Sequence, residues 1–448
     1  MHATVMRLLG FGLVSLFLSM GSPAEVYAAK SLAPASTVAD FGCASVGEIS
    51  LDECRALVSL YNNTGGLQWH NNTNWLITPT PCSWYGVICT NQHVTELHLP
   101  NNQLSGAVPS QLGNLLELRV LELSNNQLTS IPAKVGKLVK LQLLALGDNQ
   151  LALLPAEIGA LTHLQQLYLG HNRLTTIPAE LGNLLGLQAL YLNDNQLTKI
   201  QAELGTLLGL QALSVSGNQL TLIPTEIGNL TALRSLDLSR NQLTVVAAEL
   251  GHLSKLQYLD LSGNQIAAVP LELGGLTDLR QFNLSYNPPL SGPVPAIFIK
   301  LKNLTLFWFD HTTLCEPSNA KFQSWLKGIQ DVRRSGLICV YTYTVRFVLT
   351  APGQVVTLSG TGFTPLATLT LSANGTELGS LQTNAQGAFF ATLTTEHATP
   401  GVYFVSVTDI SDAAQLIIQV EPQPNAPIFA VPPALAYTQS AYLPLAGR

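Results

Sequence analysis

The chain has few charged side chains. Asp, Glu, Lys and Arg make up 11% of its 448 residues and leave a net charge of −6, whereas an average soluble protein has about 25% charged residues. This scarcity excludes a disordered acidic tail, a long charged coiled coil and a basic face of the kind that binds nucleic acid. The surface must be covered largely by Asn, Gln, Ser and Thr. We therefore expect any partner to be bound mainly through hydrogen bonds and aromatic contacts.

The motifs of common enzyme classes are also missing. The sequence has no P-loop, no H-E-x-x-H, no G-x-S-x-G and no G-x-G-x-x-G after a predicted strand. Its histidines are scattered along the chain rather than clustered. The sequence thus predicts a protein without catalytic activity, without a resident cofactor and without a metal.

The one long apolar run lies at the N-terminus. Arg7 precedes a run from Leu8 to Met20, and small residues suited to signal cleavage follow it. The run is shorter than the roughly 20 residues that cross a bilayer. We therefore expect residues 1–28 to be a cleaved signal peptide rather than a retained anchor. The mature protein would have no transmembrane helix and would be secreted or held at the cell surface.

An exported protein can use its cysteines in disulfide bonds. Six cysteines allow fifteen pairings. No C-x-x-C pair occurs and no histidine lies at ligand spacing from a cysteine, so the alternative of a zinc site is not favoured. Proximity along the chain favours Cys43 with Cys54, Cys82 with Cys89, and Cys315 with Cys339.

A unit of 23 residues recurs through the centre of the chain. Its pattern is LxxLxxLxLxxNxLxxIPxxLGx, and a tenth, degenerate unit has Thr312 in place of Asn. The first interval between Asn positions is 24 residues and the next seven are 23, a register that chance does not maintain. The Asn positions are Asn102, Asn126, Asn149, Asn172, Asn195, Asn218, Asn241, Asn264 and Asn287.

This unit resembles the leucine-rich repeat family over about residues 92–314. Alternation in Leu167-Tyr168-Leu169 places both leucines inward and the tyrosine outward from a short strand. Neighbouring strands would pair in parallel, and a single unit cannot fold alone because it has no second layer. We therefore predict an α/β leucine-rich repeat solenoid of about ten repeats, with a parallel β-sheet on its concave face.

Both ends of such a solenoid need a cap. Ser50 and Glu53 match a capping box that opens a helix. The segment 82–89 reads C-x-W-x-G-V-x-C and resembles the plant-type N-terminal cap of leucine-rich repeat ectodomains. We expect Trp69, Trp75 and Trp84 to fill the cap core, with sugar stacking as the alternative. At the far end, apolar residues at helical spacing predict an amphipathic helix over 318–329, bracketed by the last cysteine pair.

After Cys339 the periodicity changes from 23 to 2. About seven short alternating segments, with Asn374-Gly375 as a hairpin turn, predict a small all-β Ig-like sandwich that serves as a spacer. The segment 360–365, G-T-G-F-T-P, is similar to bacterial Ig-like modules. The predicted division is a signal peptide 1–28, an N-terminal cap 30–91, repeats 92–314, a C-terminal cap 315–340, a β-sandwich 341–421 and a Pro-rich tail 422–448.

The outward residues of the predicted strands, and of the turns that follow them, form what we call the strand face. It would line the concave side of the solenoid. It combines aromatic and polar side chains, a composition typical of recognition surfaces. The candidate ligand-binding residues are Tyr168, His171, Tyr191, Asp194, Asp237, Arg240, Tyr258, Asp260, Tyr286 and Trp308.

One pair on this face also suggests an enzyme. Adjacent strands would place the carboxylates of Asp237 and Asp260 about 5 Å apart, near the separation used by retaining glycosidases. An open sheet excludes little water, however, and Arg240 would lie close enough to neutralise the pair. Catalysis is therefore not expected.

The function that fits these observations is non-catalytic recognition outside the cell or at its surface. The ligand would be a protein, a peptide or a glycan, and the family resemblance implies protein–protein interaction first. The alternatives are a structural or adhesive surface protein whose repeats form a rigid rod and, less favoured, an enzyme acting on polysaccharide.

Overall fold

The computed structural model describes residues 41–318, 320–339, 348–350, 355–360, 368–373, 376–384, 389–394, 401–408, 413–420 and 436–438. The predicted signal peptide and most of the predicted Pro-rich tail lie outside these residues. Within them, no helix has the length and apolar character needed to cross a bilayer.

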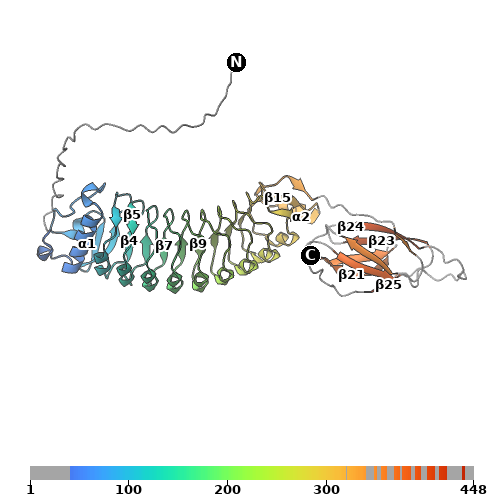
Figure 1. The fold of residues 1–448 in the computed structure, drawn as a ribbon, viewed down its shortest axis with the longest axis horizontal. Coiled ribbons are helices and arrows are strands. Elements are labelled where there is room, and N and C mark those ends of the chain that lie inside the picture. Colours follow the sequence, from blue (N-terminus) through green and yellow to red (C-terminus); the bar gives the residue numbers. More distant parts are fainter. Residues whose placement is uncertain are drawn as a thin grey trace, which may run out of the picture. The chain divides into compact units, whose positions relative to one another are not determined.

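Parallel strands of the repeats form one continuous sheet (Figure 1). The strands pair without offset, so that equivalent residues of neighbouring repeats face each other, and only β1 runs antiparallel to its neighbour. Within the described residues the sheet contains, in order, β1 (Val87–Thr90), β2 (His93–His98), β4 (Val120–Glu122), β6 (Leu143–Ala145), β7 (Gln166–Tyr168), β8 (Ala189–Tyr191), β9 (Ala212–Ser214), β10 (Ser235–Asp237), β11 (Tyr258–Asp260), β12 (Gln281–Asn283), β14 (Leu306–Trp308) and β16 (Asp331–Arg333). The parallel sheet predicted from the repeat is confirmed, and one cap strand extends it at each end.

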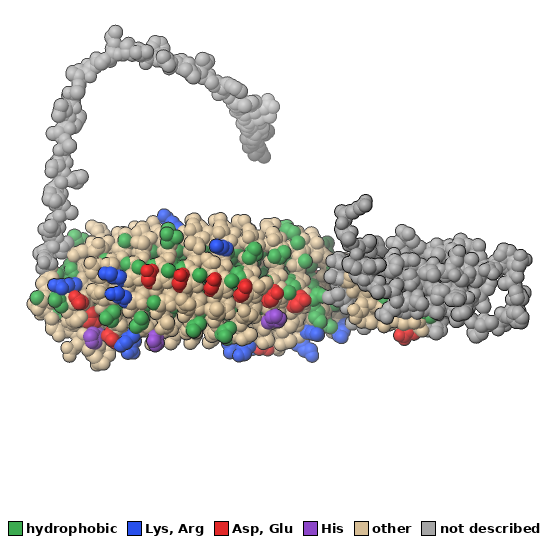
Figure 2. Space-filling model, turned by 60° about the horizontal axis from the view of Figure 1, so that its bottom comes forward, with side chains coloured by type: hydrophobic (Ala, Val, Ile, Leu, Met, Phe, Trp, Pro, Cys, Tyr) green, Lys and Arg blue, Asp and Glu red, His purple; other side chains and the backbone are tan. Residues whose placement is uncertain are grey.

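Each coil returns through a short 3₁₀ helix on the side opposite the sheet. In the repeat that contains β7, Leu174, Ile177, Leu181 and Leu184 are all buried, which completes the core predicted from the pattern. Figure 2 views the solenoid from the side of these helices, where acidic side chains form a row. A glutamate in the first turn recurs in η6 (Ala156–Ala160), η7 (Ala179–Asn183), η8 (Ala202–Thr206), η9 (Thr225–Asn229), η10 (Ala248–His252) and η11 (Leu271–Gly275).

The repeated Asn side chains lie inside the coil and bridge consecutive repeats. The Nδ2 group of Asn195 donates to the carbonyls of Leu169 and Leu192 at 3.0 and 3.1 Å. Its Oδ1 accepts from the backbone N–H of Leu174 at 2.9 Å. These bonds satisfy turn groups that no strand reaches, and a buried group without a partner would be costly.

The N-terminal cap begins with helix α1 (Leu51–Asn63), which opens with the predicted capping box between Ser50 and Glu53. Disulfide bonds join Cys43 to Cys54 and Cys82 to Cys89. Trp69, Trp75 and Trp84 are at most 5% exposed, and their rings contact one another in a chain. The tryptophans therefore fill the cap core, as expected, and cannot stack on a sugar from outside.

The C-terminal cap contains helix α2 (Ala320–Lys327), within the predicted range 318–329. A disulfide bond joins Cys315 to Cys339. The buried carboxylate of Glu316 accepts from Arg334 at 2.9 Å, so the charge buried in this cap is paired.

Two repeats that depart from the 23-residue pattern carry extra strands. Their L-S-G-x-V-P segments form β3 (Ser105–Ala107) and β13 (Ser291–Pro293), which pair in parallel with β5 (Gln127–Ser130) and β15 (Thr313–Glu316), while β17 (Leu337–Ile338) adds to β15. Gly106 and Gly292 have φ values of 84° and 90°, a region that favours glycine. The two glycines thus permit the positive φ at the centre of β3 and β13.

The C-terminal strands form two sheets in the part of this region that the structure describes. The first has the order β18 (Val348–Thr350), β24 (Ala413–Val420), β23 (Gly401–Thr408), β20 (Thr368–Ala373) and β21 (Thr376–Gln382). The second has β19 (Val355–Gly360), β22 (Phe389–Thr394) and β25 (Ala436–Thr438). Pairing is antiparallel except between β18 and β24. The strand β25 was not expected, because the sequence analysis placed residues 436–438 in an extended tail. The predicted Asn374-Gly375 turn lies outside the described residues.

Candidate functional site

Parallel pairing brings the predicted site residues of the strand face into columns. Tyr168 pairs with Tyr191, and Asp237 pairs with Asp260, each on the adjacent strand. Four other candidates occupy the turn position with φ between 52° and 56°, where Asn, Asp, His and Gly are favoured: His171, Asp194, Arg240 and Tyr286. The repeat therefore determines which residues become neighbours.

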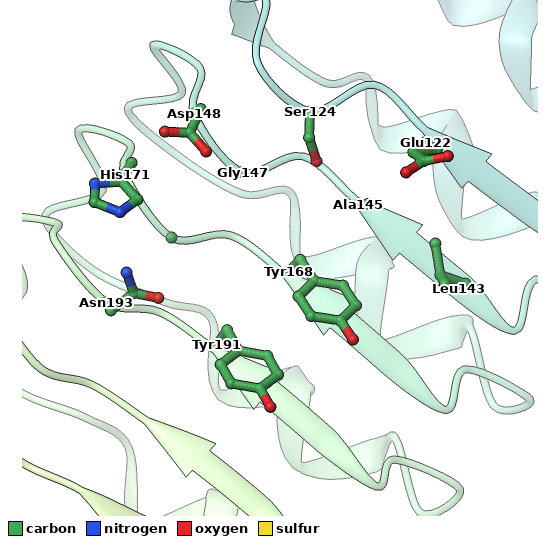
Figure 3. Close-up of a pocket in the computed structure, with 11 residues that line it drawn as sticks. Glu122, Ser124, Leu143, Ala145, Gly147, Asp148, Tyr168, His171, Tyr191 and Asn193 are labelled. Carbon is green, nitrogen blue, oxygen red and sulfur yellow. The ribbon is translucent and has the colours of Figure 1, made fainter. Parts of the chain in front are cut away.

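A shallow pocket of about 450 Å³ lies beside two stacked tyrosines (Figure 3). The rings of Tyr168 and Tyr191 are parallel within 4° and their centroids are 5.0 Å apart. The Tyr168 hydroxyl donates to Gln166 at 2.9 Å. Burial raises the pKa of the Tyr168 phenol, and the neighbouring Tyr191 raises it further, so the ring stays neutral. The pocket is lined by Glu122, Ser124, Leu143, Ala145, Gly147, Asp148, Tyr168, Gly170, His171, Tyr191 and Asn193.

A charged cluster adjoins this pocket in the turn column. Asp194 lies 3.1 Å from the guanidinium of Arg240 and 3.5 Å from the His171 ring. Arg240 belongs to the second repeat after Asp194, and it reaches across Gly217, where a Cβ atom would lie 2.4 Å from the Asp194 carboxylate. The expectation that Arg240 would neutralise Asp237 and Asp260 is therefore wrong, because Arg240 forms its ion pair with Asp194.

The carboxylates of Asp237 and Asp260 are held by hydrogen bonds to neighbouring groups. Asp237 accepts from the Ser239 hydroxyl at 2.7 Å, and Asp260 accepts from the Ser262 hydroxyl at 2.6 Å. The second oxygen of Asp260 accepts from the Tyr258 hydroxyl at 3.2 Å and from Asn283 at 3.0 Å. This arrangement orients both carboxylates as parts of a polar surface.

Tyr258 joins this polar surface as a hydrogen-bond donor. Burial raises the pKa of its phenol, and the negative charges of Asp260 and Asp237 raise it further. The hydroxyl therefore keeps its proton and donates to Asp260 across the accessible pH range.

Aromatic side chains dominate the last repeats. The Tyr286 and His311 rings stack with centroids 4.1 Å apart. Burial alone would raise the pKa of Asp310, but hydrogen bonds from Ser285 and His311 lower it below its ordinary value. The Arg333 guanidinium lies 3.8 Å from the centroid of the Trp308 ring, in a cation–π contact between adjacent strands. Among the described residues, the Trp308 indole N–H is buried without a hydrogen-bond partner.

At the other end of the strand face, His98 bridges two carboxylates. Its Nδ1 lies 2.8 Å from Glu122 and its Nε2 lies 2.8 Å from Glu96. Partial burial alone would lower the pKa of His98, but the hydrogen bonds to Glu122 and Glu96 and their negative charges outweigh it and raise this pKa. The imidazolium is therefore favoured in the folded state.

This bridge predicts a pH-dependent contribution to stability. Because the folded pKa of His98 is raised, its contribution should be complete below the unfolded pKa near 6.5 and be lost as the pH rises through the folded pKa. We expect the free energy of unfolding of the wild type to exceed that of His98→Gln by up to about 1 kcal/mol at low pH, since the site is partly exposed. Urea unfolding of both proteins between pH 5.5 and 8.5 measures this difference, and a constant difference over that range would contradict it.

Sequence reasoning missed several residues of the pocket. Glu122, Ser124 and Asp148 line the pocket but are not among the ligand-binding residues predicted from the sequence. Asp148 lies 23 residues before His171, so the repeat spacing could have predicted that it occupies the equivalent turn position on the strand face. Arg333 was missed because it lies beyond the last recognisable unit. Among the described residues, no group of three or more potential metal ligands occurs.

Comparison with known protein families identifies the repeated units. A model described as "Leucine-rich repeat region" matches residues 92–223, and one described as "Leucine rich repeat" matches residues 208–266 and 231–290. Residues 92–290 are leucine-rich repeats. The predicted repeat type is thereby confirmed for these residues.

The leucine-rich repeats resemble segments of plant receptor proteins. The chain is 40% identical over 87 residues to the probable inactive receptor kinase RLK902 of Arabidopsis thaliana, which is 19% of this chain and 13% of that protein. It is 45% identical over 58 residues to phytosulfokine receptor 2 of the same plant, which is 12% of this chain and 6% of that protein. The matches thus cover only a small part of these relatives.

A solved structure supports the fold. The crystal structure of a plant ice-binding protein matches with a TM-score of 0.52 and 24% sequence identity, over 65% of this chain and 98% of that chain. This likeness concerns the fold alone.

Proposed function

We propose that the protein is a non-catalytic recognition module that binds a peptide or an extended protein segment along its strand face. The observation that carries this proposal is the half-buried stack of Tyr168 and Tyr191 beside a pocket on an open sheet. Tyrosine pairs offer a large contact area at a low entropic cost, and they are enriched where partners bind. The partial likeness to a protein named as a receptor, phytosulfokine receptor 2, agrees with ligand recognition.

The arrangement of carboxylates favours binding over catalysis. Asp237 and Asp260 are each oriented by a serine hydroxyl and a backbone N–H two residues later in the chain. A glycosidase needs one carboxyl group that carries a proton and an enclosed site. The open sheet provides no enclosure, whereas oriented carboxylates suit hydrogen bonds to a ligand.

We further propose an extracellular or cell-surface location, with the predicted division into cap, repeats, cap, Ig-like sandwich and tail. The disulfide bonds agree with an oxidising compartment. The strands from β18 to β25 would then form a spacer, and residues 1–28 would be the signal that directs export.

The proposal predicts that removing aromatic surface abolishes binding. Peptides selected from a random library against the full chain should bind the combined variant Tyr168→Ala, Tyr191→Ala and Tyr258→Ala at least about tenfold more weakly, because central aromatic residues typically contribute above about 1 kcal/mol each. Titration calorimetry measures the loss, and circular dichroism checks the fold.

The matched control is Leu185→Ala with Leu208→Ala. These side chains are exposed by 68% and 61% and lie outside the strand face, so their loss should leave affinity unchanged. Selected peptides that bind all proteins equally would overturn the proposal, and self-association that ignores the tyrosines would favour the rigid-rod alternative. A glycan array in parallel distinguishes a sugar ligand from a peptide.

A further inference from the structure

The aromatic rings at the two ends of the strand face differ in what covers them. At the C-terminal end, Trp308 has Arg333 as its neighbour on the next strand, and the guanidinium covers its ring at 3.8 Å. In the N-terminal half, Tyr191 covers one face of Tyr168, while the neighbour on the other strand is Ala145. Because Ala145 has only a methyl group, the space beside that second face of Tyr168 belongs to the pocket (Figure 3).

The pocket combines this ring face with negative charge. Glu122 comes from β4, and Asp148 from the turn after β6, and both line the pocket. In the part of the chain that the structure describes, no cationic group forms an ion pair with Asp148. The His98 imidazolium contacts Glu122, but Glu96 shares it, so the carboxylates outnumber the cation.

The floor of the pocket is small and partly apolar. Leu143 and the nearly buried Ala145 line it with apolar atoms, while Gly147 and Gly170, which are also buried, line it with backbone and no side chain. A Cβ atom at Gly147 would meet only ordinary contacts of 3.4 Å or more, so the missing side chain leaves real space. A flat group can therefore lie against the Tyr168 ring, with its edge toward the carboxylates.

We propose that this pocket binds the guanidinium of an arginine side chain in a peptide or protein ligand. The guanidinium is flat, permanently charged and suited both to an aromatic face and to carboxylates. The ligand's guanidinium would thus make with Tyr168 the cation–π contact that Arg333 makes with Trp308 within the chain. This inference rests on the proposed function and names the ligand chemistry of one part of the strand face.

The test uses the full chain and four blocked peptides, Gly-Ser-Gly-X-Gly-Ser-Gly, in which X is arginine, lysine, citrulline or glutamate. The arginine peptide should bind at least about tenfold more tightly than the citrulline peptide, which has nearly the same shape without the charge, and more tightly than the lysine peptide. The affinity should fall with added salt, since exposed charges are screened. Titration monitored by NMR suits the weak affinity expected of a single side chain.

Two variants test whether the arginine peptide binds in this pocket. Ala145→Tyr should abolish binding, because a third tyrosine would stack on the open face of Tyr168, as tyrosines already do at the equivalent positions of β7 and β8. Asp148→Asn should weaken binding several-fold without altering the turn, because Asn125 occupies the equivalent turn position with a φ of 56°. The control Glu203→Gln removes a charge on the 3₁₀ side and should change nothing.

The outcomes separate this inference from the proposed function. If the arginine peptide binds no better than the citrulline peptide, or shows no saturation up to about 10 mM, where a cation–π contact near carboxylates ought to be measurable, the inference fails. It also fails if Ala145→Tyr retains arginine binding. In either case, library peptides that lose affinity for the triple tyrosine variant would still support the proposed function.

Discussion

Replacing Asn195 by alanine should destabilise the protein by about 3–5 kcal/mol, because it removes several buried hydrogen bonds at once. The buried Leu174 N–H would lose its partner. The carbonyls of Leu169 and Leu192 would each lose one of two amide donors, because Asn172 and Asn218 also donate to them, and each lost bond contributes about 0.5–1.5 kcal/mol. Each unsatisfied buried group costs about 1–3 kcal/mol. Urea unfolding at neutral pH measures the loss.

The control for this prediction is Gln196→Ala, one residue later. Gln196 is exposed, so its truncation should change the free energy of unfolding by at most about 0.5 kcal/mol. Equal losses in the two variants would show that the Asn column does not hold neighbouring coils together.

Replacing Gly205 by alanine should destabilise the protein by about 3 kcal/mol, although alanine is the better helix former. A Cβ atom at Gly205 would lie 2.5 Å from the carbonyl oxygen of Glu226 in the next coil. The obstacle is backbone, which cannot rotate away, so the two coils would have to separate and lose core contacts. Thermal unfolding should show a lower midpoint and circular dichroism an otherwise similar fold.

Gly209 offers a control within the same repeat. A Cβ atom there would meet its nearest atoms at 3.8 Å, an ordinary contact. Gly209→Ala should therefore be neutral or stabilising by up to about 1 kcal/mol, because it restricts the unfolded chain. If both variants behaved alike, close approach of the coils could not explain the glycine in the 3₁₀ helix.

Together these variants distinguish residues that stabilise the solenoid from residues that bind the ligand. Asn195 and Gly205 act inside the coil and between coils, so their replacement should lower stability without a specific effect on ligand choice. Ala145 and Asp148 lie on the strand face, where changes should alter binding while the midpoint of unfolding stays near that of the wild type.

Much of the architecture could be predicted from residue spacing. A period of 23 with leucines at fixed positions leaves one way to bury them, which is a stack of coils with parallel strands. The buried Asn column and the capping box at Ser50 and Glu53 followed from local chemistry. In a solenoid each coil contacts its neighbours in sequence, so local patterns largely determine the core.

The contacts on the strand face could not be predicted in the same way. The repeat makes Tyr168 a neighbour of Tyr191 and Ala145, but only the structure shows that the two rings stack and that a pocket remains above the alanine. Arg240 was expected beside Asp237 and instead pairs with Asp194 across Gly217. A long side chain on an open surface has several possible partners within reach. Arg240 contacts Asp194 because Gly217, on the repeat between them, has no side chain in the way.

Residue spacing was enough to predict the coil and its buried columns, because leucine burial and Asn hydrogen bonding recur from repeat to repeat, and proximity along the chain was enough to pair the cysteines. The position of the surface pocket and the pairing of the charges became visible only in the folded chain. That information depends on side-chain conformations and on contacts between residues of different repeats, such as Arg333 with Trp308, which no repeat pattern encodes.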